Sequence, residues 1–204
     1  MSLTDVNLRL DDGPVPADVC AFLREADRRI DEFQQHARVP GFVASDFTSV
    51  YRLLRALSSA NLPGNLFCEW GSGFGVIACL AAMLDFDAVG IEIEGDLVDA
   101  AQKLADDFEL PVEFIRGSFI PKGGSVYADV RGGYAWLNTD EAGTNDEQGF
   151  DADDFDVIFA YPWPDEEGAT EKLFDRYARA GALLVTYHGG DDLRLRRKAG
   201  KKKR

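Results

Sequence analysis

The sequence predicts an α/β fold in which a mostly parallel sheet lies between layers of helices. Short apolar runs alternate with amphipathic stretches along much of the chain, which is the pattern of repeated strand and helix units. A glycine-rich turn follows the first apolar run, and the next run ends in a carboxylate. The 204 residues suit one domain with a sizeable core, and a hydrophobic content of 46% is ordinary for a soluble globular chain.

Two helices are predicted before the first strand. Residues 16–35 place apolar side chains three and four residues apart, which is the spacing of one helix face. The pair Pro40-Gly41 ends this pattern. Asp46 is then a candidate N-cap for a second helix, because residues 47–57 repeat the same spacing.

Five strands and three further helices follow. The predicted strands cover residues 66–69, 88–93, 112–115, 156–160 and 183–187. The predicted helices between them cover residues 76–84, 96–108 and 171–180. Because crossovers between parallel strands are right-handed, we expect the carboxyl ends of all five strands along one edge of the sheet.

The glycine-rich turn carries the strongest functional signal. It reads Glu69-x-Gly71-x-Gly73-x-Gly75, directly after the first strand. Glycine permits positive φ and lets a ligand approach the backbone. A dinucleotide-binding turn would place its third glycine at position 76, where this chain has Val76, so NAD fits poorly. The string instead resembles the first motif of class I S-adenosylmethionine-dependent methyltransferases, and all four positions match.

The resemblance covers residues 42–187 and implies a three-layer, Rossmann-like methyltransferase fold that binds S-adenosyl-L-methionine. Glu92, which ends the second strand, takes the position of the carboxylate that binds the ribose hydroxyls, and Glu94 is the neighbouring candidate. Ser118 and Phe119 stand where the family contacts adenine; Ser118 replaces the acidic residue often found there. The resemblance assigns cofactor contacts to Glu69, Gly71, Ser72, Gly73, Gly75, Glu92, Ile93, Ser118 and Phe119.

The segment after the fourth strand is the candidate acceptor side. Amino-group methyltransferases of the family commonly have Asn or Asp, two prolines and an aromatic residue there, whereas this chain has Tyr161-Pro-Trp-Pro164. Trp163 beside Asp165 suits a cationic amine. The candidate catalytic residues are therefore Tyr161, Trp163 and Asp165, and Tyr161, Asp165 and His188 are the candidates for a general base.

The two ends of the chain define the predicted domain. Residues 1–193 form a single domain, with an N-terminal helical part at 14–60 and a core at 61–190, and residues 194–204 form a basic, disordered tail. Residues 42–46 are loosely similar to the upstream segment of protein-lysine methyltransferases. The family usually adds a helix and an antiparallel hairpin after its fifth strand. Either this sheet is short, or residues 125–137 supply a hairpin.

The net charge limits the expected substrates, and the spacing of the cysteines bears on metal binding. The formal net charge is −14 although the tail alone holds eight basic residues, so the body repels nucleic acid and suits a basic protein or a small molecule as substrate. Nucleic acid is expected only through the tail. The three cysteines show no metal spacing, and no metal is expected. No signal peptide or membrane span is predicted, which favours the reducing cytoplasm.

The function expected from the resemblance is methyl transfer to an amine of a protein or a small molecule. Three alternatives stay open. The chain is a cofactor-binding module without catalysis, a nucleotide-dependent oxidoreductase, or a nucleic-acid methyltransferase guided by its tail. The altered segment at Tyr161 favours the first, and Val76 argues against the second.

Overall fold

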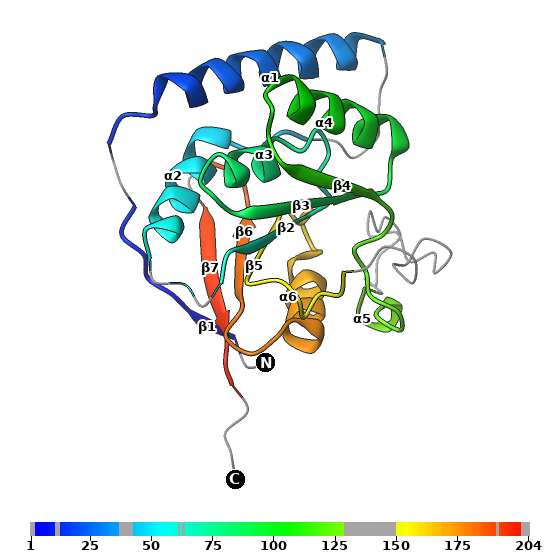
Figure 1. The fold of residues 1–204 in the computed structure, drawn as a ribbon. Helices are drawn as coiled ribbons and strands as arrows, with labels where there is room; N and C mark the ends of the chain where they lie inside the picture. The colour runs from blue at the N-terminus through cyan, green and yellow to red at the C-terminus, as the bar shows by residue number, and fades with distance from the viewer. Residues whose placement is uncertain are drawn as a thin grey trace.

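The computed structural model of the chain describes residues 3–10, 13–36, 43–60, 62, 64–128, 150–190 and 192–200. These residues form a seven-stranded sheet with helices on both faces (Figure 1). The strand order is β1-β7-β6-β5-β2-β3-β4, so the chain reverses its direction of travel across the sheet between β2 and β5. In an open α/β sheet, ligands bind beside the strand ends at such a reversal.

Five parallel strands form the centre of the sheet, and each lies within one residue of its predicted bounds. Strand residues alternate between two hydrophobic clusters: Phe67 packs on one face, and its neighbour Cys68 on the other. The predicted mostly parallel α/β fold is confirmed. The strands are β2 (Leu66–Trp70), β3 (Asp87–Glu92), β4 (Val112–Arg116), β5 (Val157–Ala160) and β6 (Leu183–Tyr187).

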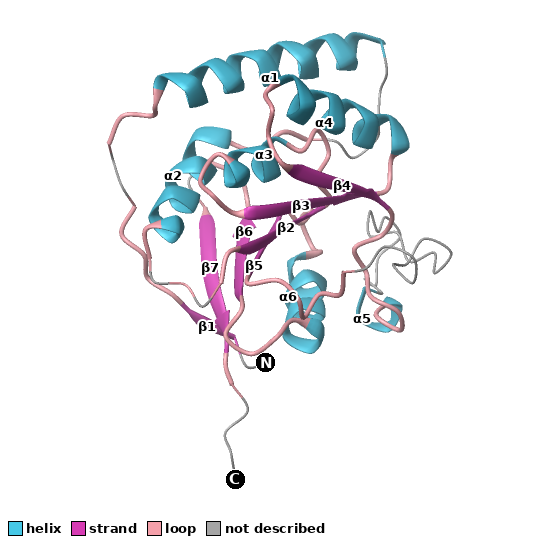
Figure 2. Ribbon diagram, viewed as in Figure 1, coloured by secondary structure: helices cyan, strands magenta, loops and turns pink. Residues whose placement is uncertain are grey.

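Helices cover both faces of the sheet (Figure 2). One face carries the helices that precede β4 in the chain, α1 (Ala17–His36), α2 (Phe47–Ser58), α3 (Val76–Ala82) and α4 (Gly95–Asp107). The other face carries α5 (Ser125–Ala128) and α6 (Glu167–Tyr177). Helix α6 begins four residues before the predicted start at Glu171, because its first turn buries only the small residues Ala169 and Thr170, which give a weak apolar pattern.

Asp46 is the N-cap of α2, as predicted. Its backbone is extended, and one carboxylate oxygen accepts hydrogen bonds from the N–H groups of Thr48 and Ser49, both at 3.1 Å. The cap satisfies two of the N–H groups that a helix leaves without partners in its first turn. Helix α2 then packs its apolar face against α3 and the sheet.

One edge of the sheet has two outer strands that were not predicted from the sequence. Strand β7 (Leu193–Lys198) pairs antiparallel with β6, and β1 (Leu3–Asp5) pairs antiparallel with β7. The prediction of a disordered tail from residue 194 is therefore wrong for residues 194–198. The sheet is not short, and residues 125–128 form α5 and not a strand of the predicted hairpin. The rest of that hairpin lies outside the described residues.

Ion pairs hold β7 against acidic neighbours. Arg196 binds the Asp5 carboxylate, with Nε 3.1 Å from Oδ1, and also pairs with Glu171 of α6. Arg194 binds Asp192, with Nη2 2.6 Å from Oδ2. Between these cations, Leu195 is buried in the core. The basic residues that indicated a tail thus alternate with apolar residues along a strand of the sheet.

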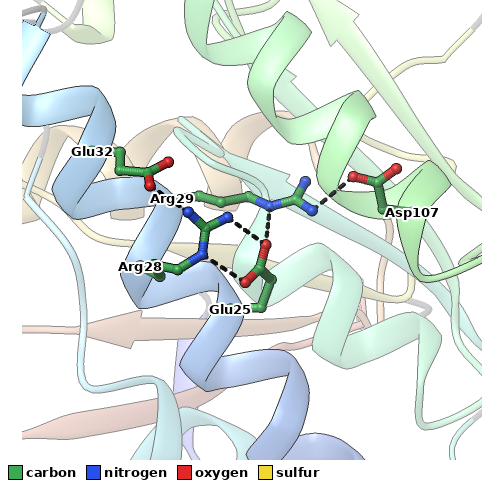
Figure 3. Close-up of polar contacts among 5 residues, drawn as sticks. All are labelled: Glu25, Arg28, Arg29, Glu32 and Asp107. Carbon is green, nitrogen blue, oxygen red and sulfur yellow. Dashed lines mark hydrogen bonds and ion pairs between the residues drawn. The ribbon is translucent and has the colours of Figure 1, made fainter.

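Helix α1 is joined to α4 by an ion network (Figure 3). Arg29 binds Glu25 within α1 at 2.8 Å and reaches across to Asp107 at 2.7 Å. Arg28 pairs only within α1, with Glu25 and Glu32. Hydrogen bonds from Arg28 and then Arg29 lower the pKa of Glu25 to about 2, so its carboxylate is charged at neutral pH.

Aromatic contacts place α1 beside the glycine-rich turn. The Phe33 ring of α1 meets Phe74 of the turn edge-on, with ring centroids 5.2 Å apart. Phe22 meets Phe108 in the same way at 5.1 Å.

Among the described residues, no helix combines the length and the apolarity that crossing a membrane would need.

Truncation distinguishes a strand from a tail. A chain ending at Asp192 loses the buried Leu195 and leaves β1 and β6 without β7, so we expect the free energy of unfolding to fall by about 3 kcal/mol or more and the melting temperature by about 10 °C. A chain ending at Gly200 keeps β7 and should melt with the full-length protein. Thermal unfolding followed by circular dichroism measures both melting temperatures. If the chain ending at Asp192 melted at the same temperature as the full-length protein, the pairing of β7 with β1 and β6 would be contradicted.

Candidate functional site

The predicted site residues lie at or just after the carboxyl ends of the parallel strands. The glycine turn follows β2, Glu92 ends β3, and Ser118 comes two residues after β4. Tyr161 follows β5, and His188 follows β6. Since β2 and β5 are neighbours at the reversal of the sheet, the glycine turn and the Tyr161 segment start from adjacent strands.

The backbone of the glycine turn is left-handed at three alternate positions. The φ angles of Gly71, Gly73 and Gly75 are 70°, 53° and 68°. The N–H groups of Gly71 and Ser72 both donate to the carbonyl of Ile91 in β3, each at 2.9 Å. The turn is therefore attached to the neighbouring strand, and side chains other than glycine would be strained at its three left-handed positions.

The glycines of the site have different tasks. A Cβ atom on Gly75 would lie 2.3 Å from the Phe114 ring, and one on Gly90 would lie 2.6 Å from it. Both glycines thus make room for Phe114 of β4. A Cβ on Gly71 would meet only the Phe119 ring, at 4.0 Å. A ligand can therefore approach the backbone of the turn at Gly71.

Glu92 connects the turn to the start of α4. One carboxylate oxygen accepts a hydrogen bond from the N–H of Gly73 at 2.8 Å. The other accepts from the N–H groups of Ile93 at 2.8 Å and Glu94 at 3.0 Å. Each carboxylate oxygen has two lone pairs, so the first oxygen retains capacity for a ligand hydroxyl. Glu94 is exposed and makes no cap hydrogen bond with its side chain, so Glu92 is the better ribose candidate of the two.

Glu69 has a structural role that the sequence did not indicate. Its buried carboxylate accepts a hydrogen bond from the N–H of Ala78 in the first turn of α3 at 2.8 Å. Gly75, the N-cap of α3, has no side chain to do this. Burial raises the pKa of Glu69 well above its ordinary value, the charge of Glu92 adds to the effect, and the Ala78 hydrogen bond opposes it. Binding of a cofactor by Glu69 stays a prediction.

The segment after β4 is fixed by local contacts. The hydroxyl of Ser118 is buried and accepts a hydrogen bond from the N–H of Ile120 at 3.2 Å. Phe119 stacks on Trp70, with ring centroids 5.1 Å apart and planes inclined by 10°. The sequence analysis did not single out Trp70, although its place directly before Gly71 was a usable signal.

On the acceptor side, Tyr161 contacts β6, and a turn follows it. The Tyr161 ring meets Tyr187 edge-on at 4.8 Å, and burial, followed by the effect of Tyr187, raises the pKa of Tyr161. The N–H of Glu166 donates to the carbonyl of Trp163 at 2.9 Å, and the exposed Asp165 has a φ of 75°. Pro164 before a positive φ is typical of a type II turn, in which glycine is preferred at the position of Asp165.

The cysteines do not offer a reactive thiol here. Cys68 and Cys79 are buried, and burial raises the pKa of each thiol above its ordinary value. Within the described part of the chain, no group of three or more histidine, cysteine and carboxylate side chains is arranged to hold a metal ion. The chemistry of this edge therefore rests on the glycine turn, Glu92 and the residues after β4, β5 and β6.

Comparisons with known proteins bear on the fold. No protein-family model matches the chain, and no curated protein matches it in sequence. Among solved structures, a methyltransferase from Geobacter sulfurreducens aligns over 91% of this chain and 92% of its own, with a TM-score of 0.53 and 16% identity. An RNA methyltransferase from Salinibacter ruber in complex with S-adenosyl-L-homocysteine aligns over 94% and 97%, with a TM-score of 0.49 and 18% identity.

The chain has the fold of class I methyltransferases. The alignment with the Geobacter sulfurreducens protein carries this statement, and at 16% identity it concerns the fold alone. In this methyltransferase fold, the turn between β2 and α3 and the carboxylate at the end of β3 lie at adjacent strand ends. The hydrogen bond between Gly73 and Glu92 joins them directly.

Two alanine substitutions separate the tasks of the glycines. Gly71 and Gly75 have nearly equal φ angles, so backbone strain of about 1 kcal/mol applies to both variants. Only Gly75→Ala adds a clash with Phe114. We expect this variant to lower the free energy of unfolding by about 2 kcal/mol more than Gly71→Ala does. Urea unfolding measures the difference. Adding Phe114→Leu should restore part of the stability lost in Gly75→Ala and none of that lost in Gly71→Ala. If both glycine variants lost the same stability and Phe114→Leu restored none of it, the packing role of Gly75 would be contradicted.

Proposed function

We propose that the protein is an S-adenosyl-L-methionine-dependent methyltransferase that transfers a methyl group to an amine of a protein or a small molecule. The observation that carries the proposal is the carboxylate of Glu92, which is fixed by the N–H groups of Gly73, Ile93 and Glu94 at the edge of a methyltransferase fold. A fixed acceptor of this kind suits the two hydroxyls of a ribose.

The residues at this edge fit the cofactor. The backbone at Gly71 has open space where a Cβ would stand, so the aminoacyl part of the cofactor can approach it. Glu92 would hold the ribose. Beside it, Ile93, Ser118 and Phe119 would contact the adenine, with Phe119 kept in place by Trp70. Glu69 would act indirectly, because it caps the helix that follows the turn.

The protein's part in the reaction is alignment and exclusion of water. The cofactor supplies a methyl group on a cationic sulfur, and this group passes directly to the acceptor. The chain must therefore hold the acceptor nitrogen in line with that bond, with its lone pair unprotonated. We assign Tyr161, Trp163 and Asp165 to this task, because they follow the strand next to the glycine turn.

An amine is favoured by the chemistry of the acceptor side. Trp163 and Tyr161 offer aromatic faces, and Asp165 and Glu167 offer negative charge. A nucleic-acid acceptor is less favoured, because Arg194 and Arg196 already pair with carboxylates of the body and the chain is strongly acidic. A cytoplasmic location, a basic protein as partner, and the absence of a resident metal remain part of the proposal.

Calorimetry with a matched pair of variants tests the cofactor site. We expect S-adenosylmethionine and S-adenosylhomocysteine to bind, and Glu92→Gln to weaken both by about tenfold or more, since an amide cannot accept from both groups of N–H donors. Glu94→Gln removes the same charge two residues further along the chain and should bind like the wild type. Loss of affinity in both variants would show an effect of charge alone, and no binding by the wild type would refute the proposal.

Transfer of labelled methyl groups tests catalysis. With radiolabelled S-adenosylmethionine and a cell lysate, we expect label in protein or in small amines, and a loss of at least tenfold in Trp163→Ala at unchanged cofactor affinity. Asp153→Asn, an exposed acidic site far from β5's carboxyl end, serves as the control. Cofactor binding without any transfer would instead support a binding module that has lost catalysis.

A further inference from the structure

His188 lies between the polar side chains of Thr186 and Glu167, directly after β6. Its side chain is only 7% exposed. Nε2 lies 2.8 Å from the hydroxyl of Thr186, which is itself buried in the sheet. Nδ1 lies 3.9 Å from a carboxylate oxygen of Glu167. We call Glu167, His188 and Thr186 the histidine chain.

The histidine chain joins three parts of the acceptor side. Glu167 is the first residue of α6, directly after the Tyr161–Glu166 segment. Thr186 belongs to β6, which pairs with β5. The N–H of His188 donates to the carbonyl of Asp192 at 2.9 Å and so closes the hairpin between β6 and β7. A change at His188 can therefore reach the start of α6 without passing through the glycine turn.

We propose that the protonation state of His188 positions residues 161–165, and with them the methyl acceptor, by tightening or loosening the contact with Glu167. This inference rests on the proposed function, because it concerns the acceptor side of the same site. His188 acts here as a positioning residue, since its Nε2 is occupied by Thr186 and its ring is almost fully enclosed.

The proton changes what the imidazole can hold. A neutral imidazole has one N–H, whereas a protonated one donates from both nitrogens. With Nε2–H on Thr186, the charged Nδ1–H would bind the Glu167 carboxylate at about 2.8 Å, which is the usual length of such a charged hydrogen bond. The present separation of 3.9 Å would shorten, and the first turn of α6 would move toward the hairpin.

Several charged groups around the ring set the pH range. Burial lowers the pKa of His188 below 6.5, and Arg194 lowers it further, while Asp192, Glu167 and Glu171 oppose this. The ring therefore takes up a proton at a lower pH than an ordinary histidine does. Because the unfolded chain binds this proton more readily, stability falls as the pH drops through 6.5. The contact with Glu167 limits that loss.

Proton NMR can follow the ring directly, because the chain has two histidines. His36, exposed at the end of α1, gives the second signal. We expect His188 to titrate below the ordinary histidine value of 6.5, and Glu167→Gln to lower its midpoint further by removing the opposing carboxylate. Glu113→Gln, at the opposite edge of the sheet, should leave the midpoint unchanged. If Glu167→Gln left the titration midpoint of His188 unchanged, the pairing of His188 with Glu167 would be overturned.

Trp163 fluorescence tests whether the position of the segment follows the proton. The signal is the difference between the wild type and Trp163→Phe, recorded from pH 5 to pH 8. We expect a transition with the NMR midpoint of His188, and none in His188→Gln, which keeps a hydrogen-bonding side chain but cannot titrate. A signal that does not change with pH, or a transition that persists in His188→Gln, would overturn the proposal.

S-adenosylhomocysteine binding, measured in parallel, separates this inference from the proposed function. We expect its affinity to be the same above and below the midpoint, because the histidine chain does not involve β2, β3 or β4. An affinity that follows the His188 midpoint would overturn the restriction to the acceptor side. No binding at any pH would refute the methyltransferase proposal, while the fluorescence transition would still decide the role of His188.

Discussion

The carboxylate of Glu92 accepts three backbone hydrogen bonds, and the arrangement of the site depends on them. One comes from the glycine turn and two from the start of the loop that leads into α4. Without this anion, two segments that follow different strands would have no direct side-chain link at the edge of the sheet. The three donors also fix the orientation of the carboxyl group, so a binding partner with hydroxyl groups meets an acceptor that is already oriented.

The second carboxylate beside this turn is that of Glu69, and its surroundings differ from those of Glu92. Glu69 is enclosed, its pKa is raised by burial and by Glu92, and its single backbone donor is in α3. Two adjacent buried charges are costly, so these surroundings favour the protonated form of Glu69. Phe114 fills the remaining space between Gly75 and Gly90, which keeps the turn close to the sheet.

Local patterns were sufficient to predict the parallel strands, the cap at Asp46 and the glycine turn, because each depends on neighbours in sequence. Strand β7 was missed because four of its six residues are basic, and its apolar positions, Leu193 and Leu195, are too few to show an alternation. Strand β1 has only three residues and is stabilised by partners almost two hundred positions away. The task of Glu69 and the link between His188 and Glu167 depend on distances that no spacing rule gives.

The pairing of β1 with β7 affects how the protein is made. Leu3 leaves the ribosome long before its partner in the sheet, Lys198. Strand β1 must therefore wait, without its neighbour, until β7 has been synthesised. Contacts between residues so far apart in the chain slow folding, and an unpaired strand can associate with other chains in the interval. Completion of this sheet is therefore a step that follows the synthesis of β7.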